Sequence, residues 1–312
     1  MKFVDLHCDT AGKLYYGKEE KLKKNNLSVD IEKLKKAQAM AQFFALFIAK
    51  DHCENLFNTC DEMLDNLLME LKENESEISL ALTYNNVIEN SSSGKLSGII
   101  TIEEGEALMG DMKNLHYFYN KGVRLITLTW NFENSIGYPN FNEEFMNKGL
   151  KDFGIDLVRE MNRLGVIIDV SHLSDGGFHD VAKYSEKPFV ASHSNARYVK
   201  DHRRNLTDSM IKTLGEKGGV MGINFCSSFL GDSSKATLDD MVSHIKHIKN
   251  VGGIDVIALG SDFDGIGNEV EIKDISEMNK LSFKLQKEGF SYEDIEKIFH
   301  KNALRVMKEI LK

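Results

Sequence analysis

The sequence is poor in cysteine, which bounds the chemistry that the chain can use. Its 312 residues include four cysteines, Cys8, Cys53, Cys60 and Cys226, and no two of them form a Cys-x-x-Cys pair. Such spacing gives neither a disulfide framework nor a thiolate zinc site. We therefore expect reduced, mostly buried thiols, and we look for metal ligands among the histidines and carboxylates.

The chain also lacks an excess of positive charge and a long apolar run. Its formal net charge is −9, so the basic surface that binds nucleic acid or anionic lipid is not expected. The longest nearly apolar run, 37–49, contains Gln38 and Gln42 and falls short of the roughly 20 residues that span a bilayer. Charged residues near the N-terminus occupy the place of the apolar stretch of a signal peptide. We expect no nucleic-acid partner, no membrane association and a cytoplasmic location.

Short apolar runs of strand length recur along the chain and alternate with segments of helical periodicity. The eight runs are 2–6, 42–48, 98–102, 123–128, 166–170, 188–191, 220–225 and 256–259. Alternation of this kind predicts parallel strands with helical crossovers, and eight such units close as a (β/α)8 barrel. A doubly wound open sheet is the weaker alternative, because no glycine-rich phosphate loop follows the first run. At this length we expect one catalytic domain over 1–312.

Ionisable residues appear where several of these runs end, which is the active face of a barrel. The first run leads to His7 and Asp9, the third to Glu103 and Glu104, the fifth to His172 and the sixth to His193. Nitrogen and oxygen ligands from four strands suit a pair of zinc ions bridged by a carboxylate. The pattern alone does not choose between Glu103 and Glu104.

Three further features have open alternatives. Asp262 and Asp264 follow the eighth run, and either is a candidate acid/base, with Asp262 favoured because it comes first. Arg203 and Arg204 form a solvated cluster or supply one arginine that clamps a substrate carboxylate. We interpret His244 and His247 as part of a solvated helical face, and we assign no function to the histidines at 52, 116, 179 and 300.

In combination these motifs resemble the renal or membrane dipeptidase family of zinc peptidases, amidohydrolase-like barrels, over nearly the whole chain. The matching segments are Asp5-Leu6-His7-Cys8-Asp9-Thr10, Ile102-Glu103-Glu104-Gly105, Asp169-Val170-Ser171-His172, Ser192-His193-Ser194, Asn205 after the two arginines, and Gly260-Ser261-Asp262-Phe263-Asp264-Gly265.

The resemblance implies a role for each matching residue. His7 and Asp9 would hold one zinc ion, His172 and His193 the other, and Glu103 would bridge the two. Arg204 would bind the carboxylate of the dipeptide, and Asp262 would transfer protons. The family cleaves dipeptides, often with a D-residue at the C-terminal position, and some members open β-lactam rings.

One position departs from the family. Animal members carry a histidine that contacts substrate after the fourth strand, whereas this chain has Trp130 followed by Asn131. Trp130 cannot accept a proton or carry charge, so we expect Trp130 and Asn131 either to contact the substrate or, for Trp130, simply to form a wall of the pocket.

The prediction is therefore a metallodipeptidase with two zinc ions per chain that cleaves small dipeptides, including L-Xaa-D-Xaa, through a metal-bridged hydroxide. Another binuclear amidohydrolase activity, on a cyclic amide, lactone or N-acyl amino acid, is the first alternative. A non-catalytic ligand-binding barrel is the second. A homodimer is the expected assembly, because soluble enzymes most often form one.

Overall fold

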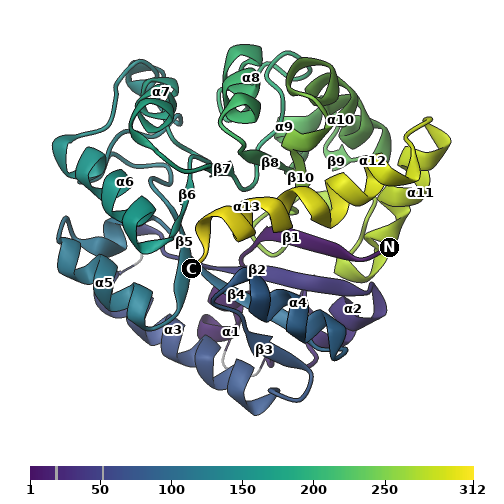
Figure 1. The fold of residues 1–312 in the computed structure, drawn as a ribbon, viewed down its shortest axis with the longest axis horizontal. Coiled ribbons are helices and arrows are strands. Elements are labelled where there is room, and N and C mark those ends of the chain that lie inside the picture. The colour runs from purple at the N-terminus through teal and green to yellow at the C-terminus, as the bar shows by residue number, and fades with distance from the viewer. Residues whose placement is uncertain (18–19, 51–52) are drawn as a thin grey trace.

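The computed structural model describes residues 1–17, 20–50 and 53–312, so His52 lies outside the described residues. Nine parallel strands form one sheet, and the pairing of β2 with β4 closes eight of them into a barrel (Figure 1). The eight barrel strands are β1 (Phe3–Cys8), β2 (Ala39–Phe47), β4 (Leu96–Glu103), β5 (Val123–Thr127), β6 (Ile167–Asp169), β7 (Val190–Ala191), β8 (Val220–Ile223) and β10 (Ile257–Leu259). Each overlaps one of the eight predicted runs, so the predicted barrel is confirmed.

Three short strands were not predicted. Strand β3 (Ile78–Leu80) pairs with the start of β4 outside the ring, and β9 (Lys235–Ala236) pairs with β11 (Glu269–Val270) in a separate two-stranded sheet. Segments of two or three residues are too short to show an alternating pattern, so the sequence carries no periodic signal for them.

Helices follow most of the strands and surround the barrel (Figure 1). They are α1 (Thr10–Tyr16), α2 (Ile31–Lys36), α3 (Leu56–Glu73), α4 (Tyr84–Ser92), α5 (Met112–Asn120), α6 (Asp152–Leu164), α7 (Asp175–Tyr184), α8 (Asp208–Glu216), α9 (Ser227–Leu230), α10 (Leu238–Gly252), α11 (Asn279–Lys287), α12 (Tyr292–Glu296) and α13 (Asn302–Ile310). A π-helical turn, Lys297–Lys301, joins α12 to α13.

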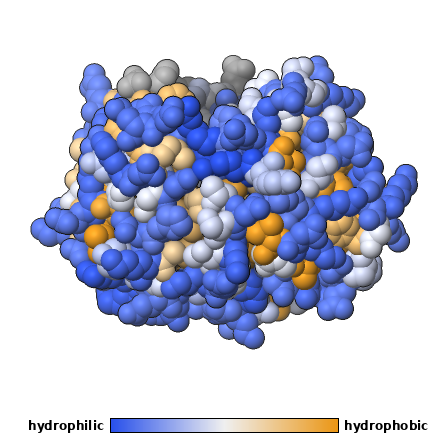
Figure 2. All heavy atoms as spheres, turned by 90° about the horizontal axis from the view of Figure 1, so that it is seen from above, coloured by the Kyte–Doolittle hydropathy of each residue, from blue (hydrophilic) through white to orange (hydrophobic). Residues whose placement is uncertain are grey.

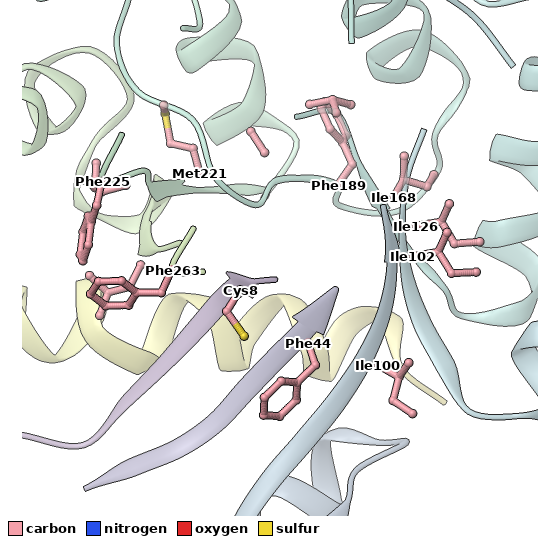
Figure 3. Close-up of a cluster of buried hydrophobic side chains, with 14 of the residues drawn as sticks. Cys8, Phe44, Ile100, Ile102, Ile126, Ile168, Phe189, Met221, Phe225 and Phe263 are labelled. Atoms are coloured by element: carbon pink, nitrogen blue, oxygen red, sulfur yellow. The ribbon is translucent and has the colours of Figure 1, made fainter. Parts of the chain in front are cut away.

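The larger core cluster lies between the barrel strands and the helices. Ile102, Ile126 and Ile168 form one row of it, because these residues are register partners on β4, β5 and β6 (Figure 3). All three are fully buried, and each contributes roughly 1.5–3 kcal/mol to stability by leaving water. This row fixes the relative positions of the strands that carry Glu103 and Asp169 at their ends.

A second core cluster closes one end of the barrel. It joins apolar side chains on the strands, among them Leu125, Ile167 and Val220, with Met307 and Ile310 of α13. Helix α13 crosses in front of the strands in Figure 1. The carboxyl ends of the strands, where loops supply the ionisable residues, lie at the opposite end.

The surface is largely polar. The face shown in Figure 2 is mainly hydrophilic, and apolar side chains lie on it in small separate groups. In the described part of the chain, every helix is too short or too polar to cross a membrane.

Candidate metal centre and active site

The carboxyl ends of four barrel strands bring the five predicted ligands together. His7 lies in β1, Asp9 precedes α1, and Glu103 is the last residue of β4. His172 and His193 lie in the loops that follow β6 and β7. All five are less than one-tenth exposed, so the cluster lies at the base of the mouth of the barrel and is shielded from bulk water.

Glu103 stands at the centre of this cluster, and its two carboxylate oxygens face different groups. Oε2 lies 3.0 Å from His7 Nε2. Oε1 lies 3.1 Å from His172 Nε2 and 3.5 Å from His193 Nε2. The carboxylate therefore divides the cluster into two halves and touches both, which is the geometry of a bridging ligand.

The first half of the cluster, which contains His7 and Asp9, has buried polar atoms without hydrogen-bond partners. His7 Nε2 lies 3.5 Å from Asp9 Oδ2 and 3.9 Å from Asp262 Oδ1. Within the described residues, Nδ1 of His7 and Oδ1 of Asp9 are buried and accept or donate no hydrogen bond, and Nε2 of His7 lies close to carboxylate oxygens without the angles of a hydrogen bond. Folded proteins rarely leave buried polar atoms unpaired, and a cation held between these atoms would satisfy them.

The second half of the cluster, which contains His172 and His193, presents imidazole nitrogens that carry no proton. Ser192 Oγ lies 2.6 Å from Asp169 Oδ2 and 2.6 Å from His193 Nδ1. Because the single hydroxyl proton goes to the Asp169 carboxylate, His193 Nδ1 must donate to Ser192 Oγ. Nε2 of the neutral ring is then unprotonated.

His172 is held in the same tautomer by Asn131. Its Nδ1 donates to Asn131 Oδ1 at 3.0 Å, so Nε2 is again unprotonated when the ring is neutral. The two Nε2 atoms of His172 and His193 lie 3.1 Å apart and both face Glu103. Three acceptors that point at one another repel unless a cation lies between them.

The charge states of the side chains in the cluster also favour a bound cation. Burial, together with Arg204, lowers the pKa of His172 to about 4. Burial also lowers the pKa of His193, to which His7 and Arg204 contribute. Although burial opposes it, the carboxylates of Glu103 and Asp9 raise the pKa of His7. The site thus favours neutral imidazoles in one half and a positive charge in the other.

These observations test whether the residues fit a metal pair. Two overlapping groups place one ligand atom per residue within 4.8 Å of one another: His7, Glu103 and His193, and His7, Asp9 and Asp262. Imidazole and carboxylate are the ligands of catalytic zinc sites. The donor set and the fixed tautomers fit bound cations, and the first of the two groups joins His7 with His193 of the other half.

Asp262 lies beside this cluster and is anchored at one oxygen. Asn224 Nδ2 donates to Asp262 Oδ2 at 2.8 Å, while Oδ1 faces His7. Burial raises the pKa of Asp262 to about 8, with the carboxylates of Asp9 and Glu103 adding to the rise and His7 opposing it. A carboxyl group with such a pKa can exchange a proton near neutral pH.

The two acidic neighbours that compete with Glu103 and Asp262 in the sequence have structural partners instead. Glu104 has φ 87° and accepts hydrogen bonds from the backbone of Glu106 and Trp130 and from Asn134. Asp264 accepts from Thr10 Oγ1 at 2.6 Å and from the backbone of Ser28 at 2.7 Å. Both carboxylates therefore hold the loops around the site in place through hydrogen bonds.

Gly265 makes room for the acidic side chains. A Cβ atom at this position would lie 2.0 Å from Asp9 Oδ2 and 2.6 Å from Asp262 Oδ1. Only a residue without a side chain lets the two carboxylates keep their places beside His7.

Arg204 extends from the loop after β7 toward the cluster and is incompletely paired. It is 3% exposed, and Nη1 donates to Ser194 Oγ at 2.7 Å. Its Nε and Nη2 are buried without a hydrogen-bond partner among the residues that the structure describes. Unpaired guanidinium donors can receive a carboxylate. Arg203 is exposed instead and donates to the carbonyl of Phe141.

A cavity of about 680 Å³ opens above the cluster. Its lining includes Asp9, Glu103, His172 and Asp262 at the base and Trp130 and Asn131 at the side. Trp130 packs edge-on against Phe47, with ring centroids 4.8 Å apart. Both predicted substrate-contact residues therefore line the cavity, although the side-chain oxygen of Asn131 is engaged with His172.

Sequence reasoning missed Ser192, Asn224 and Gly265 as functional positions. Asn224 follows β8, where the strand-end pattern could have identified it, but the predicted run continued to Phe225 and concealed it. The interpretation of His244 was wrong: it is fully buried, accepts from the backbone of Ala196 and donates to the carbonyl of Leu230. His247 is also shielded, since it stacks on Tyr198 with ring centroids 4.6 Å apart.

The chain as a whole is similar to known proteins. A family model described as membrane dipeptidase, peptidase family M19, matches residues 1–312. The chain belongs to this family. The resemblance seen in the sequence is thereby confirmed, and the chain is placed among metallopeptidases that act as dipeptidases.

Individual relatives cover almost the whole chain. An uncharacterized dipeptidase of Schizosaccharomyces pombe is 31% identical over 99% of this chain and 80% of its own length. A metallopeptidase from Rhodobacter sphaeroides, solved with a phosphinate mimic of the dipeptide L-Ala-D-Ala, is 25% identical, has a TM-score of 0.91 and covers 99% of both chains. The solved dipeptidase AC, a metallopeptidase of family M19, is 26% identical, with a TM-score of 0.92, over 100% of this chain and 99% of its own.

Proposed function

We propose that this protein hydrolyses the peptide bond of dipeptides with two zinc ions held by His7, Asp9, Glu103, His172 and His193. The proposal rests mainly on the position of the Glu103 carboxylate. One of its oxygens faces His7, and the other faces His172 and His193. When bound, zinc supplies Lewis acidity, which polarises a carbonyl oxygen and lowers the pKa of water toward neutrality.

Arg204 would recognise the free carboxylate at the C-terminal end of the substrate. Its Nε and Nη2 are buried and unpaired in the described part of the chain, and burial without a partner is costly for a charged group. A dipeptide carboxylate offers two oxygens that match these donors in a bidentate pair. A longer peptide would present an uncharged amide at this place, so the site selects substrates that end one residue beyond the cut.

Asp262 would move the protons of the reaction. Its Oδ1 faces the cluster, while Asn224 holds Oδ2. Asp262 would accept a proton from the attacking water as the tetrahedral adduct forms. It would then return that proton to the departing amine, which could not leave as an anion.

We infer that a D-residue is accepted at the C-terminal position. The similar metallopeptidase from Rhodobacter sphaeroides was solved with a phosphinate mimic of L-Ala-D-Ala. A second candidate function, hydrolysis of a cyclic amide, lactone or N-acyl amino acid, would use the same zinc ions but would not need the unpaired guanidinium donors of Arg204. A ligand-binding barrel would not need Asp262.

The decisive experiment combines metal analysis with a substrate panel. Purified protein is expected to contain two zinc ions per chain and to hydrolyse L,L and L,D dipeptides. Activity should disappear on chelation and return with zinc. Turnover of cyclic amides, lactones or N-acyl amino acids in preference to dipeptides would replace the proposal, and zinc-loaded protein without hydrolytic activity would support the binding barrel.

The role of Arg204 has a matched control in its neighbour. Arg204→Ala should raise KM for a dipeptide at least about 10-fold, because a charge-assisted pair is lost, and should change KM little for the corresponding dipeptide amide. Arg203→Ala should behave as the wild type with both substrates, since its guanidinium is exposed. Equal effects of Arg204→Ala on dipeptide and amide would contradict the role. The homodimer and the cytoplasmic location stay predictions from the sequence.

A further inference from the structure

We propose that the cavity selects dipeptides whose N-terminal residue has a large apolar side chain, and that this side chain packs against Phe47 and Trp130. The inference rests on the proposed function, because it uses a dipeptide whose C-terminal carboxylate is bound by Arg204. It goes further by naming the class of substrate.

The arrangement of the strands sets the direction of a bound dipeptide. In the closed ring, β7 and β2 are four steps apart either way, through β6, β5 and β4 or through β8, β10 and β1. Arg204 comes from the loop after β7, and Phe47 is the last residue of β2. The two residues therefore belong to opposite sides of the mouth.

The ligand cluster lies between these two sides. Glu103 is the register partner of Phe47 on the neighbouring strand, and its Oε1 faces His193 in the loop after β7. A dipeptide with its carboxylate at Arg204 and its peptide bond over the cluster must direct its N-terminal residue toward β2. One extended residue advances the backbone by about 3.5 Å, so the side chain of the N-terminal residue lies on the side of the cluster that faces away from Arg204.

The wall on the β2 side is aromatic. The rings of Phe47 and Trp130 meet edge to face with centroids 4.8 Å apart, and Phe132 lies 5.3 Å from Trp130. Phe47, Ala49 and Trp130 line the cavity together with Tyr16 and Ile266. Tyr16 is 59% exposed, so it borders the opening of this apolar region rather than its base.

The position of Trp130 is fixed from behind. Its backbone N–H donates to Glu104 Oε2 at 3.0 Å, and that buried carboxylate is itself held by Asn134. The ring is therefore a preformed surface that does not have to be ordered when substrate binds. Lys13 also lines the cavity but lies exposed on α1, so the apolar wall dominates the contact with a side chain.

The test is a series of dipeptides with a constant C-terminal D-Ala and with Gly, Ala, Leu, Phe, Asp or Lys at the N-terminal position. Zinc-loaded wild type should show kcat/KM values that rise from Gly through Ala to Leu and Phe, with about a 10-fold or greater gain from Ala to Leu. Asp and Lys should be poor substrates.

Variants assign the preference to the wall. Phe47→Ala and Trp130→His should each reduce the ratio of kcat/KM for Phe over Ala at least about 5-fold. Phe141→Ala should keep the ratio, because Phe141 belongs to the same loop as Trp130 but is 59% exposed and does not line the cavity. Trp130→His provides a second variant if Phe47→Ala does not fold.

The outcomes separate this inference from the function on which it rests. Hydrolysis of all six dipeptides without a gain for Leu and Phe, or a preference for Asp or Lys, would overturn the inference and leave the dipeptidase function intact. An unchanged ratio in both wall variants would also overturn it. Failure of the zinc-loaded protein to cleave these six dipeptides and their counterparts with a C-terminal L-Ala would overturn both.

Discussion

The side-chain amide of Asn224 donates a hydrogen bond of 2.8 Å to Oδ2 of Asp262. Oδ1 of the same amide accepts from the backbone N–H of Cys226 at 2.6 Å. Turning the amide over would place donor against donor at Cys226 and acceptor against acceptor at Asp262, so the orientation is fixed. Asn224 therefore decides which oxygen of Asp262 faces the ligand cluster.

Replacing Asn224 should separate turnover from substrate binding. In Asn224→Ala the carboxyl group of Asp262 loses its anchor, and kcat should fall about 10-fold or more because proton transfer depends on position. KM and zinc content should change less, since the only hydrogen bond from the Asn224 side chain to a predicted ligand is a long one, 3.3 Å, to the backbone carbonyl of His193 among the described residues. Steady-state kinetics and metal analysis measure these quantities.

Asn268→Ala is the control for this variant. Asn268 also hydrogen-bonds backbone atoms, at Phe225 and Ser227, but does not touch Asp262. It should retain wild-type kcat. An Asn224→Ala enzyme with unchanged kcat, or with a defect confined to KM, would rule out the positioning role.

Ser192 should affect metal affinity without being a ligand. Ser192→Ala removes the hydroxyl that holds His193 Nδ1 and links it to Asp169. Loss of such a partner typically lowers metal affinity about 10- to 100-fold. Competition with a chromogenic chelator should show this loss, and Ser185→Ala, a buried serine bonded to Asn162 away from the site, should not. Equal zinc affinity in the two variants would contradict a role of Ser192 in orienting His193.

Two glycines of one loop offer a sharp steric comparison. Gly265→Ala would place a methyl group 2.0 Å from Asp9 Oδ2, whereas a methyl group at Gly267 would meet nothing within 4 Å. We expect Gly265→Ala to lose zinc and to reduce kcat/KM at least about 100-fold, because displacement of about 1 Å at a reacting centre has effects of this size. Gly267→Ala should match the wild type in both measurements. If the Gly265→Ala protein were active and contained the wild-type amount of zinc, the loop would have to move enough to accept the methyl group, and the prediction would be wrong.

His244 should make stability sensitive to acid. Burial lowers its pKa to about 4, while in the unfolded chain a histidine titrates near 6.5. Between these values the unfolded chain binds a proton that the folded protein does not. The contribution is therefore present above pH 6.5 and is lost as the pH falls toward 4, by about 1.4 kcal/mol per pH unit.

Urea unfolding at pH 7 and pH 5 tests this linkage. The fall in the free energy of unfolding between the two pH values should be smaller by about 2 kcal/mol in His244→Gln than in the wild type. His179→Gln, in which the replaced histidine is exposed, should keep the wild-type fall. An identical fall in His244→Gln would contradict the assignment.

The barrel could be predicted because its signal is local. Each strand is a short apolar run, and the order of runs and helical segments fixes the topology. Strand β7 shows that a very short strand can still be predicted. Only Val190 and Ala191 pair as a strand, but Phe189 beside them is also fully buried. The apolar run therefore extended beyond the paired residues and identified the strand.

The site could be predicted only as a set of candidates. Glu103 and Glu104 are adjacent and equally acidic, and the choice between them depends on the backbone of Glu104, which turns to φ 87° and directs its carboxylate toward Asn134. His244 was misjudged because its partners come from other elements: Ala196 lies in the loop after β7, and Leu230 ends α9. Its neighbours on the helix do not reveal them.

The carboxylate of Asp5, in the first barrel strand, accepts hydrogen bonds from the backbone and hydroxyl of Ser261, 256 positions later and just beyond β10, the last barrel strand. During synthesis on the ribosome, the start of the protein must therefore wait, with β1 unpaired on one side, until β10 has emerged. Helix α13, which covers the far end of the barrel, emerges later still. Nearly complete chains would expose apolar strand edges, so we expect them to depend on chaperones more than the finished enzyme does.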